Sequence, residues 1–123
     1  MAANGVALAQ THLLWVQGEA DYQQTQAWYQ TRLEALLAAW LSDGFLTAAS
    51  KVVLSQIPVG TSRYGAGVTA AKAAVAAANA ATVDDLLLPV LMNADNLHYN
   101  GQGQVQHAYD VYEFFFSAPH LET

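Results

Sequence analysis

Three short apolar runs alternate along this chain with three segments of helical spacing, and this alternation restricts the possible folds more than any other feature. Apolar residues at consecutive positions are typical of parallel strands that are buried on both faces. A repeated strand–helix order predicts an α/β fold, and right-handed crossovers would make its strands parallel in one sheet. The runs cover residues 11–16 (THLLWV), 51–57 (KVVLSQI) and 86–92 (LLLPVLM). Pro89 has no backbone N–H, so the third strand is predicted at a sheet edge.

The first two predicted helices follow from spacing and from alanine content. One helix begins near Thr25 and ends at Asp43 and Gly44, where the glycine suits a left-handed cap position. Residues 68–81 are predicted helical because alanine loses no side-chain entropy when it is ordered. The first helix presents an apolar stripe made of Tyr29, Leu33, Leu36, Leu37 and Trp40.

The last helix is predicted after a polar loop at residues 93–101. We expect its apolar face to be core, and Phe114, which lies off that face, to add to an interaction surface. His107 falls on the polar side of this helix. The apolar face carries Val105, Ala108, Tyr109, Tyr112 and Phe116.

Length and composition predict a single unit over residues 1–123, without an internal repeat or a linker. Only 11% of the residues are charged and 54% are hydrophobic, so the chain is expected to bury much of its surface. The formal net charge is -6 and the four basic residues form no cluster, which argues against nucleic-acid binding. The N-terminus is a poor signal peptide and no stretch suits a membrane span, so a soluble protein of unspecified compartment is predicted.

The absence of cysteine excludes disulfides, thiolate metal sites and a cysteine nucleophile. The histidines show no spacing with Asp or Glu that would build a metal site. We interpret His12, which alternates within the first strand, as a packed core histidine. No metal is therefore expected.

Polar residues follow two of the predicted strands, at residues 17–21 (QGEAD) and 93–98 (NADNLH). In open parallel sheets, ligands bind beyond the carboxyl ends of the strands, so both clusters are expected to face one crevice. Asp95 lies three residues before His98, where its carboxylate can hydrogen-bond the imidazole and leave the other ring nitrogen to take a proton from a serine. A four-residue D-x-x-H pattern is common, and by itself it also fits a solvated loop with a surface histidine.

Two blocks carry a resemblance to a known family. Residues 15–21 (WVQGEAD) look like the W-x-Q-G-E-x-D block of SGNH hydrolases of the sialate O-acetylesterase and acetylxylan esterase kind. Residues 95–103 (DNLHYNGQG) are similar to the final D-x-x-H block of the same enzymes. Between them, residues 55–58 (SQIP) resemble the strand end before the penultimate helix, and the resemblance covers roughly residues 11–116.

The resemblance implies a three-layer flavodoxin-like fold with strand order 2-1-3-4-5, of which about three strands and three helices are present here. It also implies hydrolysis of an acylated carbohydrate or other small ester through an acyl-serine, without a cofactor. By position, His98 would be the general base, Asp95 its orienting acid and Gln17 an oxyanion-hole donor. Gly18, Glu19 and Asp21 match the block as supporting residues, and the two acids also fit a purely structural role in holding Gln17.

The family's serine block, G-x-S or G-D-S after the first strand, is missing from this chain. The resemblance is thus to a C-terminal half, a partial domain whose serine must come from a missing segment or from another chain. We interpret Ser62 as an ordinary turn serine, because it lacks a strand-to-helix elbow. Without family strands 1 and 2, the strand at 11–16 would be a bare edge, which predicts self-association or a complementary chain there. The alternative function is a non-catalytic oligomerising or structural module derived from the esterase fold.

Overall fold

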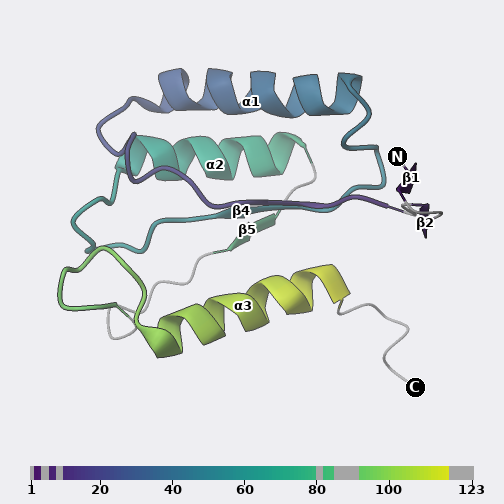
Figure 1. Cartoon of the computed structure of the whole chain (residues 1–123). Helices are drawn as coiled ribbons and strands as arrows, with labels where there is room; N and C mark the ends of the chain where they lie inside the picture. Colours follow the sequence, from purple (N-terminus) through teal and green to yellow (C-terminus); the bar gives the residue numbers. More distant parts are fainter. Residues whose placement is uncertain (1, 4–5, 8–9, 80–81, 85–91, 117–123) are drawn as a thin grey trace.

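The computed structural model describes residues 2–3, 6–7, 10–79, 82–84 and 92–116. Its main sheet has three parallel strands in the order β3 (Leu13–Trp15), β4 (Val52–Ser55) and β5 (Thr82–Asp84). Helices α1 (Gln26–Ser42) and α2 (Ala66–Ala78) cover one face of this sheet, and α3 (Gly101–Phe116) lies on the other side (Figure 1). A short antiparallel pair, β1 (Ala2–Ala3) and β2 (Val6–Ala7), precedes them. The predicted α/β fold is confirmed, and the strand order matches the last three strands of an incomplete flavodoxin-like sheet.

The main core lies between the sheet and the helices α1 and α2. Leu54 of β4 is fully buried, and the small side chains of α2 let that helix approach the strands closely. The predicted stripe of α1 points into this core through Tyr29, Leu33 and Leu37.

Local chemistry fixes both ends of α1 as the sequence predicts. The hydroxyl of Thr25 accepts a hydrogen bond from the Trp28 N–H at 3.2 Å and caps the first turn. Gly44 follows the helix with φ +77°, the left-handed conformation that glycine adopts without steric cost. The boundaries of α1 are therefore set by residues within a few positions of each end.

The helix predicted over residues 68–81 is displaced in the structure. It begins at Ala66 and ends at Ala78. The end is set by Asn79, because its side chain and its backbone N–H both donate to the Val75 carbonyl and close the last turn. The β-branched Thr82 and Val83 then enter β5, where the sequence reading placed no strand. Of the strand predicted at 86–92, all but Met92 lies outside the described residues.

The prediction that the apolar face of α3 is core is wrong. Its large residues are 57–60% exposed, whereas His107, Phe114 and Phe115 are partly buried on the opposite side. The partial burial of Phe114 also contradicts its predicted role in an interaction surface. The ammonium group of Lys51 donates to the Phe115 carbonyl at 3.0 Å and so ties the end of α3 to the sheet. The exposed large residues are Val105, Tyr109, Tyr112 and Phe116.

His12 is exposed, so its predicted place in the core is also wrong. Its Nδ1 accepts the Lys51 N–H at 2.9 Å, and its ring lies 5.5 Å from that of Phe115. His12 lies just before the edge strand β3, where its ring bonds a backbone N–H and remains exposed.

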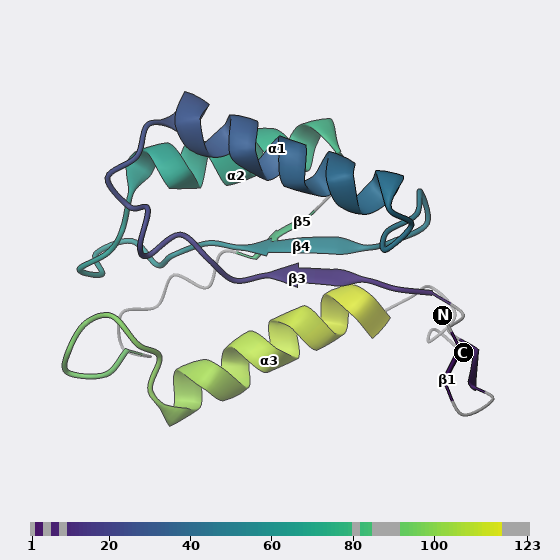
Figure 2. The same ribbon diagram turned by 45° about the horizontal axis from the view of Figure 1, so that its top comes forward.

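Within the described part of the chain, β3 pairs with β4 alone and forms one edge of the sheet (Figure 2). Leu14 in β3 is 40% exposed, and Val16, just after this strand, is 53% exposed. In the described ranges, no helix has the length and the apolar character needed to cross a bilayer.

Candidate functional site

A cavity of about 150 Å³ opens at the carboxyl ends of β3 and β4. This is the end of a parallel sheet at which ligands bind. Both predicted polar clusters contribute to it, Gln17 and Glu19 from the first and His98 from the second. The remaining lining residues are Val16, Ser55, Gln56, Ile57, Pro58, Met92, Leu97, Tyr99 and His107.

Asp95 and His98 form the pair that the sequence predicts. The Asp95 Oδ2 lies 2.6 Å from the His98 Nδ1, and the Asp95 Oδ1 accepts the N–H groups of Leu97 at 2.9 Å and His98 at 3.1 Å. The hydrogen bond from His98, reinforced by the two backbone N–H groups, lowers the pKa of Asp95 from 3.8 to about 2. Because Nδ1 is engaged by the carboxylate, Nε2 is the nitrogen that can exchange a proton with a hydroxyl group.

The loop that carries this pair is held against a second loop. Asn96 adopts φ 53°, and its side-chain amide donates to the Gly60 carbonyl at 2.6 Å. In return the Asn96 carbonyl accepts the Ser62 N–H at 2.9 Å. These bonds fix the position of His98 although its side chain is 70% exposed. Ser62 itself serves the turn and does not line the cavity.

The lowered pKa of Asp95 gives a first testable prediction. Its carboxylate is stabilised in the folded chain, so this contribution is present above pH 3.8 and is lost as the pH falls toward 2. The Asp95 carboxyl carbon, followed by ¹³C NMR, should titrate with a midpoint near 2. In His98→Ala the midpoint should rise, but not fully to 3.8, since the two backbone N–H donors remain. An Asp95 midpoint that is the same in both proteins would contradict the contact.

Gln17 is fixed by bonds at both ends of its amide. Its Oε1 accepts the hydroxyl of Tyr29 at 2.6 Å, and its Nε2 donates to the Asp21 Oδ2 at 2.7 Å. Burial raises the pKa of Tyr29, which keeps the phenol protonated as the donor. One N–H of the Gln17 amide is thus used by Asp21, and the amide has a second N–H to offer. Asp21 contacts Gln17 directly, as a supporting residue would.

Gly18 and Lys72 hold the backbone under the cavity. Gly18 is buried at φ +140°, and a Cβ there would lie 2.9 Å from the Val68 Cγ1. Lys72 is fully buried on α2, and its ammonium group donates to the carbonyls of Gln17 and Ser55, at the ends of two adjacent strands. Burial lowers the pKa of Lys72 from 10.5 to about 8.

Sequence reasoning missed Lys72, although a signal was present. It is the one charged side chain on the buried face of α2, which otherwise carries Val68, Ala71, Val75 and Ala76. A charge at such a position must be satisfied by buried partners. The two strand-end carbonyls meet that requirement.

The structure also joins two residues that the sequence reading left apart. Ser55 ends β4 and is 4% exposed, and its Oγ lies 2.7 Å from the His107 Nε2 on α3. Both residues line the cavity, where the His107 ring also lies 5.5 Å from that of Tyr99. The sequence offered only one signal for the pair, the place of Ser55 at the carboxyl end of a strand.

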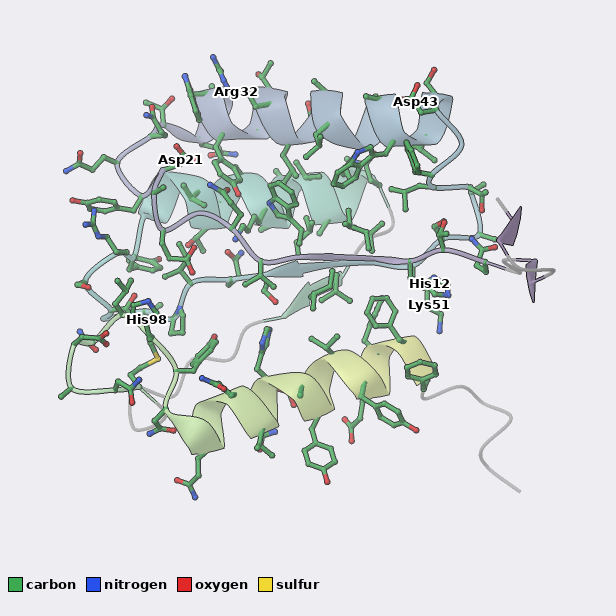
Figure 3. All side chains as sticks on the ribbon, viewed as in Figure 1. His12, Asp21, Arg32, Asp43, Lys51 and His98 are labelled. Atoms are coloured by element: carbon green, nitrogen blue, oxygen red, sulfur yellow. The ribbon has the colours of Figure 1, made fainter. Side chains whose placement is uncertain are left out.

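The predicted site residues gather at one end of the molecule. Asp21 and His98 lie at the same end of the sheet, whereas His12 and Lys51 lie at the opposite end (Figure 3). Asp95 stands beside His98, and Gly18 and Asp21 flank Gln17 without lining the cavity. Over the described residues, no three His, Asp or Glu side chains converge as they would around a metal ion.

Comparison with known proteins gave one finding. The family model described as carbohydrate esterase, sialic acid-specific acetylesterase, matches residues 2–115. Neither the curated proteins nor the solved structures gave a match. The matched span contains both polar clusters and the whole cavity lining.

Proposed function

The chain belongs to the carbohydrate esterases of the sialic acid-specific acetylesterase family, and from this premise we propose that it provides the acid–base part of a serine esterase that removes acetyl or similar acyl groups from carbohydrates. The observation that carries the proposal is the 2.6 Å contact between Asp95 and His98 beside a cavity that Gln17 also lines. The nucleophilic serine comes from a segment or chain other than this sequence.

In the proposed reaction, the His98 Nε2 takes the proton of that serine while its oxygen attacks the ester carbonyl. Asp95 holds the imidazole through Nδ1 and stabilises its protonated form. His98 then returns the proton to the departing sugar hydroxyl, and in the second half it activates the water that releases the acid.

The Gln17 amide is proposed as an oxyanion donor. Its side chain is held by Tyr29 and Asp21, so little reorganisation is needed when negative charge develops on the carbonyl oxygen. A donor of this kind contributes roughly 10²–10³ in kcat. The amide adds no charge of its own, which suits a site that must first accept a neutral ester.

The edge of β3 is the proposed docking place for the part that carries the serine. An added strand would pair with the β3 backbone and cover Leu14 and Val16, which are exposed along this edge. The serine would then stand at the carboxyl ends of the strands, near His98. The exposed apolar face of α3, on the side of the sheet opposite α1 and α2, offers further apolar surface.

A second candidate function is a non-catalytic module that oligomerises. Two observations favour it: the β3 edge, which pairs only with β4 in the described part, and the exposed apolar face of α3. Both features fit self-association as well as they fit a complementary chain.

Reconstitution tests the two candidates against each other. A polypeptide carrying the family's serine block is supplied as a separate chain, or fused ahead of Met1, and hydrolysis of an O-acetylated sugar is measured. The esterase proposal expects activity in the assembled protein and none when the supplied serine is changed to alanine. An assembled protein that forms a stable complex yet hydrolyses no ester would contradict the proposal and favour the oligomerising module.

A further inference from the structure

Ser55 and His107 have the geometry of a nucleophile and its base. Their 2.7 Å separation falls within the range of 2.6–3.2 Å over which a histidine can take the proton of a serine hydroxyl. With the proton of the neutral imidazole on Nδ1, Nε2 accepts the Ser55 O–H. We propose that Ser55 and His107 form a second nucleophile–base pair, in which small activated esters can acylate Ser55, and fluorophosphonates can phosphonylate it, without a serine from elsewhere.

The position of Ser55 is fixed more firmly than that of an ordinary surface serine. It is the last residue of the central strand β4, which pairs with β3 and β5. Its carbonyl also accepts a hydrogen bond from the buried ammonium group of Lys72. The hydroxyl is therefore held in one place relative to His107, as nucleophilic attack requires.

The surroundings suit a small electrophile. Ser55 and His107 line the cavity of about 150 Å³, which has room for a short acyl or phosphonyl unit. Gln17, on the same cavity wall, has an amide N–H that can approach the developing oxyanion. The positive charge of Lys72, bound to the backbone of both Gln17 and Ser55, favours negative charge at this end of the sheet.

An ester acylates Ser55 and releases its alcohol. The Ser55 Oγ forms a bond to the carbonyl carbon while its proton passes to the His107 Nε2. The tetrahedral intermediate expels the alkoxide, which takes that proton and leaves as the alcohol, so that acyl-Ser55 remains. Water, deprotonated by His107, can then attack the acyl group and regenerate the hydroxyl with release of the carboxylic acid.

A fluorophosphonate probe tests the pair on the unmodified full chain. Ser55 should displace fluoride from phosphorus, and intact-mass spectrometry should show one adduct per chain. Cleavage after Lys51 and Arg63 gives a peptide of residues 52–63 that contains both Ser55 and Ser62, so fragment ions must assign the adduct. An adduct on Ser55 supports the proposal. An adduct on Ser62, or no adduct on the folded chain, overturns it.

Two variants separate a nucleophile from a structural hydrogen bond. His107→Gln retains an amide that can bond the Ser55 hydroxyl, so the tie between α3 and the sheet can persist while the base is lost. The labelling rate should fall about 10²–10⁴-fold, with an unchanged circular dichroism spectrum. Ser62→Ala is the control, because it removes the other serine of the same peptide. In this variant Ser55 should be labelled at the original rate. Labelling of Ser55 that is indifferent to His107→Gln would also overturn the proposal.

This inference can fail independently of the proposed esterase function. Labelling is measured without the complementary serine, and neither Asp95 nor His98 takes part in it. Reconstituted hydrolysis, in contrast, is read with a sugar ester and depends on the supplied serine. A chain that reconstitutes activity but does not label at Ser55 would refute only the second pair.

Discussion

Replacing His98 by alanine is expected to lower kcat/KM of the reconstituted esterase by about 10²–10⁴-fold. The imidazole is the only group of the Asp95–His98 pair that can take and return the serine proton, because the carboxylate is engaged with Nδ1 and two backbone N–H groups. The loss should fall mainly on kcat, since His98 is exposed and provides little apolar contact to a bound sugar. Initial rates over a range of substrate concentrations measure the two parameters separately.

Asp95→Asn sharpens this experiment. The amide keeps the size of the side chain but removes the negative charge that stabilises the protonated imidazole, so a large loss of kcat is expected with assembly unchanged. Asp43→Asn is the matched control, because Asp43 is an exposed acid beyond the end of α1, away from the cavity. A reconstituted enzyme that keeps its full rate with His98→Ala would exclude the proposed base, even if Asp95→Asn proved harmful.

Local patterns predicted the parts of this fold that depend on nearby residues. The strands at 11–16 and 51–57 are confirmed in shorter form, as Leu13–Trp15 and Val52–Ser55, because continuous apolar runs identify buried parallel strands. The helix over Gln26–Ser42 is confirmed with its cap at Thr25. The contact between Asp95 and His98 was likewise accessible, since it spans three residues of one loop.

The features that escaped prediction depend on contacts between distant segments. Ser55 and His107 are 52 residues apart, and Lys72 reaches the Gln17 carbonyl across 55 residues. The exposure of Tyr109 and Tyr112 shows the same limit, because helical spacing identifies an apolar stripe but not the surface that it meets. The family blocks indicated which residues share the site. The contacts that α2 and α3 make with the site could be identified only from the structure.

Gly18→Ala is expected to destabilise the chain strongly, with a loss of about 2–5 kcal/mol in the free energy of unfolding. Two causes add. The residue has φ +140°, which an alanine adopts only with strain, and the new Cβ would lie 2.9 Å from the Val68 Cγ1 and 3.1 Å from the Ile57 Cδ1. Val68 is 1% exposed and packed in the core, so relieving the contact requires a change of its rotamer or a shift of α2 away from Gly18.

Gly44→Ala separates the two causes. Gly44 also has a positive φ, +77°, but a Cβ there would meet nothing within 4 Å. Gly44→Ala should therefore lose only the cost of backbone strain, about 1–2 kcal/mol in the free energy of unfolding. Urea unfolding of both variants, followed by fluorescence of the three tryptophans, measures the difference. The reconstituted Gly18→Ala enzyme should also lose activity, since Gln17 is displaced with its neighbour, while Gly44→Ala should keep it. Equal losses of stability in the two variants would show that the close approach of α2 to Gly18 has no energetic importance, and the held position of Gln17 would then need another cause.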